Sequence, residues 1–266
     1  MRLQRLHGFM LLLGSMLALS SNAQPMDSKV QQAVNQVLDH HYGQQWDQAN
    51  DCRRFHTPDG AFCMQLVQIE PITIAKQQYL YVMSAGEAYS AEAKLGENGH
   101  AQHGLGGLFV LVHTAQGWQT TAAAAVIETG QWGVPQIDQL KLTQIGAKRW
   151  GWVGRMGGSG AGGESNEQWL VYAPLGRVVK EIANLDAEHD YANDEYREET
   201  STQFRWRVQQ PMDAGFYRIV WSRQVVKTPM SPDGEPIQTQ AQTRRTQGIA
   251  RFDRSSMQFK THQQNE

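Results

Sequence analysis

The sequence predicts a mainly β fold: an antiparallel sandwich or open barrel-like sheet with one N-terminal amphipathic helix packed outside it. Apolar and polar residues alternate in several short segments, most clearly at 204–208 and 217–221. This period of two is typical of strands with one solvent-exposed face. A turn-forming run at 211–215 separates these two segments, as expected for a hairpin. Helical spacing is clearest near the N-terminus.

Residues 1–23 have the three parts of a secretory signal peptide. Arg2 and Arg5 give a positive start, residues 9–19 are apolar, and small residues lead to a cleavage point before Gln24. The apolar run is too short to span a bilayer. We therefore expect a periplasmic or secreted protein of a bacterial cell envelope, with no transmembrane segment in the mature chain.

Residues 24–43 are predicted to form the N-terminal helix. Asp27 and Ser28 offer an N-cap, and Tyr42 followed by Gly43 ends the pattern. Between them, apolar residues recur at i, i+3, i+4, i+7 and i+8 on one helical face: Val30, Ala33, Val34, Val37 and Leu38. This face is expected to pack against the β-rich remainder.

The chain has two cysteines, Cys52 and Cys63. A cysteine pair in an exported protein more often forms a bridge than a metal or redox site, and the spacing is too wide for a C-x-x-C motif. The sequence therefore predicts a structural disulfide that closes a polar loop, stabilising the fold by about 3 kcal/mol through loop entropy.

The remainder, residues 44–266, is predicted to be a single β-rich domain. Pro71 indicates an edge strand or a break, because proline cannot donate to a strand ladder. The Ala- and Glu-rich run 86–95 predicts a short helix, and the apolar run 178–185 is compatible with strand or helix. Five tryptophans recur at about the spacing of hairpins and are predicted to cap the ends of the sheet core: Trp118, Trp132, Trp150, Trp152 and Trp169.

The charge pattern bears on partners. The formal net charge is −2, and a mildly acidic exported protein is not built for non-specific nucleic-acid binding, which needs a basic surface. Acids outnumber bases over 164–199, whereas bases outnumber acids from Thr200 onward.

Four arginines of this C-terminal part, Arg205, Arg207, Arg218 and Arg223, are predicted to share the wet face of one hairpin. They could bind an acidic partner such as an envelope protein, an anionic glycan or lipopolysaccharide phosphate. They could equally pair with the acidic run 186–199, and this internal pairing is the favoured interpretation.

A glycine-rich stretch contains Gly158, Gly160 and Gly163 in a G-x-G-x-x-G pattern. A dinucleotide site needs a helix after this pattern, but the residues that follow have the pattern of a strand. The sequence thus favours a flexible hairpin loop and no cofactor. A backbone-lined binding lip beside Trp152 and Trp169 is the alternative, since glycine allows close approach of a ligand.

Two clusters have metal-ligand spacing. His100 and His103 form an H-x-x-H pair, and the acids Asp186, Glu188 and Asp190 alternate like the start of a calcium loop. The later positions of that loop lack the Gly and Glu that an EF-hand requires. Solvated loops are the favoured interpretation of both clusters.

No complete catalytic constellation is found in the sequence, and no catalytic residue is assigned. The leading hypothesis is an exported envelope or periplasmic protein with a binding or interaction role, whose partner is an unknown envelope protein or an anionic glycan. The alternatives are a secreted hydrolase that uses carboxylates of the 186–199 loop, or a metal-handling protein acting through His100 and His103.

Overall fold

The computed structural model describes residues 27–90, 92, 94–95, 99, 101–159, 165–193 and 198–264. For residues 159, 186–193, 211 and 264 it describes the backbone and not the side chains. The predicted signal peptide, residues 1–23, lies outside the described residues, as do His100, Gly160 and Gly163.

The chain is mainly β with one N-terminal helix, as the sequence predicts. The elements, in chain order, are α1 (Ser28–Tyr42), β1 (Trp46–Asp47), β2 (Cys52–Thr57), β3 (Gly60–Ile74), β4 (Gln77–Ala88), β5 (Gly104–Thr114), β6 (Gly117–Thr129), the 3-10 turn η1 (Ile137–Gln139), β7 (Lys141–Gly146), β8 (Arg149–Ser159), β9 (Ser165–Leu175), β10 (Val178–Asn193), β11 (Glu198–Asp213), β12 (Phe216–Pro229), the 3-10 turn η2 (Gln238–Gln240), β13 (Gln242–Asp253) and β14 (Gln258–Gln264). Neither α1 nor any other helical element of the described ranges is long and apolar enough to cross a membrane.

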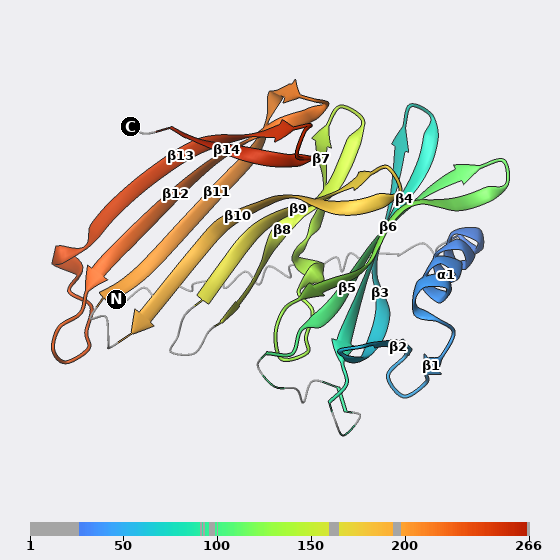
Figure 1. The fold of residues 1–266 in the computed structure, drawn as a ribbon, viewed down its shortest axis with the longest axis horizontal. Helices are drawn as coiled ribbons and strands as arrows, with labels where there is room; N and C mark the ends of the chain where they lie inside the picture. The colour runs from blue at the N-terminus through green and yellow to red at the C-terminus, as the bar shows by residue number, and fades with distance from the viewer. Residues whose placement is uncertain are drawn as a thin grey trace, which may run out of the picture.

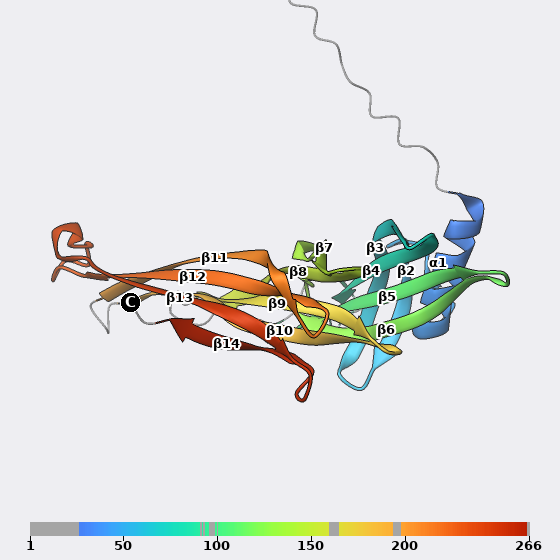
Figure 2. The same cartoon turned by 90° about the horizontal axis from the view of Figure 1, so that it is seen from above.

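The strands form a continuous path of neighbours from β1 through β6, then β10 through β14. Strands β7, β8 and β9 form a side branch that joins the path at β10. Neighbours pair antiparallel except at Val178, which pairs parallel with Ala123 to link β10 to β6. The molecule is elongated, with α1 at one end and β11–β14 at the other (Figures 1 and 2).

The C-terminal strands pack over the side branch, so this half is sandwich-like. The Trp169 ring on β9 lies 4.5 Å from the Trp206 ring on β11. Arg155 on β8 donates to the Phe204 carbonyl on β11 at 3.0 Å. Trp169 is fully buried in this core, which also contains the apolar side chains Ile145, Val153, Val171, Ile182, Phe204, Phe216, Ile219, Phe252 and Phe259.

The helix α1 follows the predicted pattern closely. The Asp27 carboxylate accepts from the Lys29 N–H, and Gly43 ends the helix with a φ of 82° that favours glycine. Its apolar face packs on β3–β5, and Figure 2 shows the helix on one side of these strands. The Tyr42 hydroxyl lies 2.9 Å from the Ser84 hydroxyl and donates to the Ala125 carbonyl, which fixes the end of the helix to the sheet.

A third core lies beneath η1. Ile137 and Leu140 are buried there with Trp152, whose ring contacts the Tyr81 ring at 5.3 Å. Trp152 and Trp169 are therefore interior residues of two different cores. The expectation that they cap the ends of the sheet is wrong, because each lies on an inward face of a strand covered by a second layer.

The pairing of the strands decides three local expectations. Pro71 faces Leu80 on β4, and β2 pairs only with Gly60–Met64 of β3, so Pro71 sits where β3 is an edge. Residues 86–88 continue β4 instead of starting a helix. Residues 186–193 belong to β10, so the acidic run expected as a loop is strand over most of its length; pairing to β9 outweighs its polar composition.

The disulfide joins Cys52 on β2 to Cys63 on β3, as predicted, with Cα atoms 5.3 Å apart. Both cysteines are buried. The bridge crosses the short hairpin between these strands, whose register places Arg54 opposite Cys63. It restrains the edge of the sheet on which α1 rests.

We expect the double variant Cys52→Ser/Cys63→Ser to lower the free energy of unfolding by about 3 kcal/mol, because the unfolded chain regains the entropy of a closed loop. Urea unfolding followed by tryptophan fluorescence measures this difference. Reduction of the unaltered protein should produce the same loss. A loss below about 1 kcal/mol for both would contradict the structural role of the bridge.

Candidate functional site

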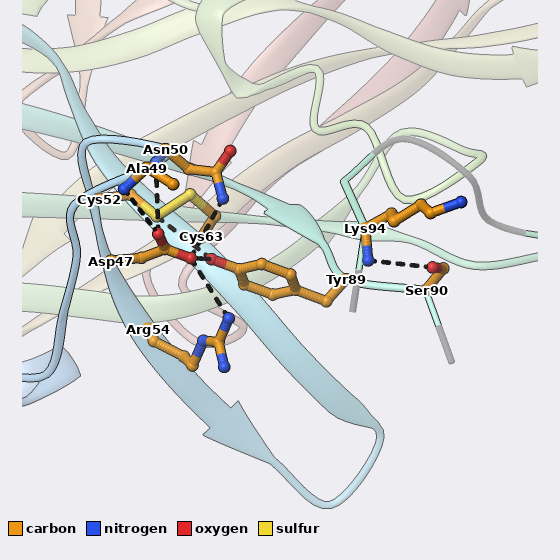
Figure 3. Close-up of polar contacts among 9 residues, drawn as sticks. All are labelled: Asp47, Ala49, Asn50, Cys52, Arg54, Cys63, Tyr89, Ser90 and Lys94. Atoms are coloured by element: carbon orange, nitrogen blue, oxygen red, sulfur yellow. Dashed lines mark hydrogen bonds and ion pairs between the residues drawn. A yellow bond between two sulfur atoms is a disulfide. The ribbon is translucent and has the colours of Figure 1, made fainter. Parts of the chain in front are cut away.

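A cluster of polar side chains lies next to the disulfide (Figure 3). The carboxylate of Asp47 accepts hydrogen bonds from the Tyr89 hydroxyl at 2.7 Å, from the backbone N–H of Ala49 at 3.0 Å and from the Asn50 amide at 3.1 Å. An Arg54 N–H also donates to it, at 3.3 Å. The hydrogen bond from Tyr89 is the largest of the effects that lower the pKa of Asp47 to about 2.

Arg54 and Tyr89 complete this Asp47 cluster. The Arg54 guanidinium lies 4.5 Å from the centre of the Tyr89 ring, and the Tyr89 hydroxyl lies 3.5 Å from Cys52 Sγ. Burial raises the pKa of Tyr89 above its ordinary value. The backbone N–H of Asn50 donates to the carboxylate as well, at 3.3 Å. An ionised carboxylate surrounded by five donors is poorly suited to proton transfer, so the cluster holds β1, β2 and the end of β4 together.

The residues proposed for metal binding are only partly described. His103 is exposed, and its Nδ1 lies 2.9 Å from the Gly130 carbonyl; its predicted partner His100 lies outside the described residues. Among the residues that the structure describes, no three His, Cys, Asp or Glu side chains gather in a metal-like group.

The alternating acids Asp186, Glu188 and Asp190 lie on β10, where they pair with Gln168, Glu167 and Ser165 of β9. Their side chains lie outside the described part. The hydrolase and calcium hypotheses assumed that these acids lie in a loop. In the structure they lie in a paired strand, whose backbone carbonyls are directed toward the neighbouring strands.

A cavity of about 680 Å³ lies between the β2–β3 hairpin and the adjoining ends of β5 and β6. His56, Asp59, His103 and Glu128 are among its lining residues. The described part of the chain shows no hydrogen bond among these four side chains, and such a bond is the geometric mark of an acid–base pair. The cavity therefore carries no catalytic assignment.

The structure separates the predicted binding residues. Gly158 is in strand β8, opposite Asn166, instead of in a loop. It lines a groove of about 410 Å³. Trp152 and Trp169 are 1% and 0% exposed, so they do not line this groove. The tryptophan that does is Trp132, which is 50% exposed.

The outer face of the C-terminal strands carries the arginines. Residues directly opposite in an antiparallel ladder share a face, and the register of β11, β12 and β13 aligns three rows across this face. The rows are Gln203, Gln224 and Arg245; Arg205, Ser222 and Gln247; Arg207, Val220 and Ile249. We call this surface the arginine face. Alternation along β12 and β13 adds Arg218 and Arg251 to it, and Lys260 on β14 lies opposite Arg251. Its cationic members are Arg205, Arg207, Arg218, Arg245, Arg251 and Lys260.

Two cations of the arginine face have acidic partners. Arg218 pairs with Asp213 at 2.7 Å, and Lys260 pairs with Asp253. These contacts lower the pKa of both carboxyl groups. Arg205, Arg207, Arg245 and Arg251 are exposed, and within the described ranges none of them forms an ion pair. A cavity of about 420 Å³ lies at Arg205 and Arg245, and its other lining residues are Arg223 and the amide and hydroxyl residues Gln203, Ser222, Gln224, Thr246 and Gln247.

The expected membership of this face needs one correction. Arg223 lies opposite Phe204, so strand alternation directs it to the inner side, unlike Arg205 and Arg207. It is half-buried and also borders the cavity at Arg205 and Arg245. Its Nε is buried without a hydrogen-bond partner among the described residues. The sequence interpretation missed Arg245, Arg251 and Lys260, which the alternation along β13 and the following hairpin could have indicated.

Comparison with protein-family models, curated proteins and solved structures finds no match to this chain.

Acid should weaken the Asp47 cluster in a defined pH range. Because the pKa of Asp47 is lowered from 3.8 to about 2 in the folded protein, its contribution to stability is present above pH 3.8 and is lost as the pH falls through about 2. We expect Asp47→Asn to have a lower free energy of unfolding than the unaltered protein at about pH 6. Between about pH 4 and pH 2, the variant should lose less further stability than the unaltered protein does. Urea unfolding at each pH measures both differences.

The matched control is Asp59→Asn, which removes a carboxylate from an exposed turn. Its acid-dependent loss of stability should follow that of the unaltered protein. If Asp47→Asn showed an undiminished loss over the acid range, the proposed fastening role would be contradicted.

Proposed function

We propose that this is an exported, non-catalytic binding protein of the bacterial cell envelope, and that its arginine face binds an anionic glycan. The signal-like segment 1–23 and the disulfide support export. The observation that carries the proposal is the set of exposed arginines, Arg205, Arg207, Arg245 and Arg251, aligned on one sheet face.

The geometry of the face suits an extended polyanion. Neighbouring strands lie about 4.8 Å apart, and residues two apart on one strand are about 7 Å apart, so Arg205 and Arg207 can contact successive anionic groups of a chain. A guanidinium binds carboxylate or phosphate with two parallel hydrogen bonds. The intervening glutamine and serine side chains, at 203, 222, 224 and 247, can both donate to and accept from sugar hydroxyl groups.

The character of the whole chain favours a glycan over nucleic acid. The net charge of −2 means that the arginine face is a local feature on an otherwise acidic protein, and long-range attraction to a highly charged duplex is correspondingly weak. An anionic glycan has a lower charge density and offers hydroxyl groups to the amide side chains of the face.

Export is testable by itself. Expressed with its own N-terminal segment in a bacterial host, the protein should be recovered from the periplasmic or secreted fraction, shortened to begin at Gln24 and with the Cys52–Cys63 bridge formed. N-terminal sequencing and mass spectrometry with and without reductant check both points. An unprocessed protein that stays in the cytoplasm would contradict this part of the proposal.

We expect the protein to bind polygalacturonate, a carboxylate glycan, more tightly than neutral dextran, with an affinity that falls as salt screens the charges. The variant Arg205→Gln/Arg207→Gln should bind about tenfold more weakly, because each exposed ion pair contributes up to about 1 kcal/mol. Isothermal titration calorimetry at two salt concentrations measures both effects.

The control variant Arg177→Gln/Lys180→Gln changes the net charge equally at exposed positions outside the arginine face and should retain full affinity. Equal weakening by both variants would show a general charge effect. Equally tight binding to duplex DNA would favour a nucleic-acid ligand and contradict the proposal.

A further inference from the structure

We propose that a second site, the groove beside Trp132, binds a neutral, hydroxyl-rich saccharide. We call it the Trp132 groove; its lining residues are Gln131, Trp132, Val134, Gln136, Gln139, Gly157, Gly158, Ser165 and Glu167. It lies where the segment between β6 and η1 meets the paired ends of β8 and β9. This site goes beyond the glycan binding proposed for the arginine face, and neither proposal depends on the other.

The backbone under Trp132 is the first observation. Val134 N–H donates to the Gln131 carbonyl at 2.9 Å, and both central residues of this turn have positive φ, 57° at Trp132 and 76° at Gly133. This is the pattern of a type I′ turn, in which Asn-Gly is strongly preferred. A bulky side chain at positive φ is an outlier, since its Cβ crowds the backbone.

Burial does not compensate for that strain. The Trp132 side chain is 50% exposed, and Val134 beside it is 43% exposed, whereas Trp152 and Trp169 are almost completely buried. Strained backbone conformations cluster at ligand sites. The turn therefore presents an aromatic ring to solvent at a cost to stability.

The turn is also held rigidly. Gly133 N–H donates to the Gln102 carbonyl at 2.7 Å, and the Gly133 carbonyl accepts from Ala88 N–H at 2.8 Å. These bonds fix the turn to the end of β4 and to the segment before β5. A ring fixed in advance loses little entropy when a ligand packs on it.

The walls of the groove supply the polar part of the site. Three amide side chains line it, and amides both donate and accept, as sugar hydroxyl groups do. The side-chain oxygen Oε1 of Gln136 accepts from the Gly157 N–H at 2.8 Å, which orients the side-chain NH₂ group of Gln136. Glu167 pairs with Arg155 at 3.2 Å, so the groove has no uncompensated carboxylate that would select a cation.

The glycines keep the groove open. A Cβ at Gly158 would overlap the amide of Gln131, and one at Gly157 would overlap the backbone of β9. A volume of about 410 Å³ falls in the usual range for small-molecule sites, about 300–1,000 Å³. An exposed aromatic ring for the apolar C–H face of a sugar, amides for its hydroxyl groups and no free charge together identify a neutral saccharide as the ligand class.

The decisive variant is Trp132→Asn, which places the preferred residue in the type I′ turn. The probes are two neutral tetrasaccharides, one built from glucose and one from N-acetylglucosamine, which distinguish a plain glucan from an acetamido glycan. We expect calorimetry to show saturable binding of at least one of them by the unaltered protein. Trp132→Asn should weaken this binding at least about tenfold, while its thermal unfolding midpoint stays equal or rises.

The control is Trp46→Asn, which removes another exposed tryptophan, 47% exposed, from outside the groove and should leave saccharide binding unchanged. The proposal would be overturned if the unaltered protein bound neither tetrasaccharide. A clear fall in the unfolding midpoint of Trp132→Asn would also overturn it, because the ring would then be structural. So would a dimer of the unaltered protein that Trp132→Asn abolishes. Binding to polygalacturonate should survive in Trp132→Asn, which separates this site from the arginine face.

Discussion

The packing of the C-terminal strands over Trp169 determines which side chains of these strands face solvent. Phe204, Trp206 and Ile219 point inward toward that ring and its neighbours. Because side chains alternate along a strand, burying these residues forces Arg205 and Arg207 outward. A slip of one residue in register would bury the arginines, so the apolar core and the charged face specify each other.

The inner face also shows how tightly the register is set. Trp206 and Trp221 are directly opposite, and Gly248 on β13 leaves room for the Trp221 ring, which a Cβ there would overlap. The exception is Arg223, a charged residue on the inner side whose Nε has no partner among the described residues. Its long side chain can keep its charged end toward the rim of the layer while its stem packs inside.

The two proposed sites use the β scaffold differently. The arginine face is a regular sheet surface, in which spacing is fixed by the ladder and the ligand is selected by charge. The Trp132 groove lies at an irregular connection, in which a strained turn presents one ring and neighbouring amides. We propose that both sites hold glycans of the cell envelope.

Local features were predictable from sequence because they depend on neighbours in the chain. The cap at Asp27, the stop at Gly43 and the hairpin around 211–215 have direct signatures. The position of Arg223 was also within reach, since it is an odd number of residues from Arg218 and must face the opposite way on a regular strand.

Long-range features were not predictable in this way. The sequence has no signal for β10 lying beside both β9 and β6. The acidic run 186–193 is a strand because residues 186–190 pair along β9 and residues 191–193 pair with β11. Burial of Trp152 and Trp169 depends on which layers cover them, so composition could not distinguish them from the exposed Trp132. The type I′ conformation at Trp132 was hidden because its residue type argues against that turn.

The most direct test of the account is the reactivity of individual arginines toward phenylglyoxal, followed by mass spectrometry of the peptides. We expect fast modification of Arg205, Arg207 and Arg245, slow modification of Arg223, and protection of the first three by polygalacturonate. Modification of Arg223 at the same rate as Arg205, or no protection of the three outer arginines, would contradict the assignment of the two sides of this sheet and the function drawn from it.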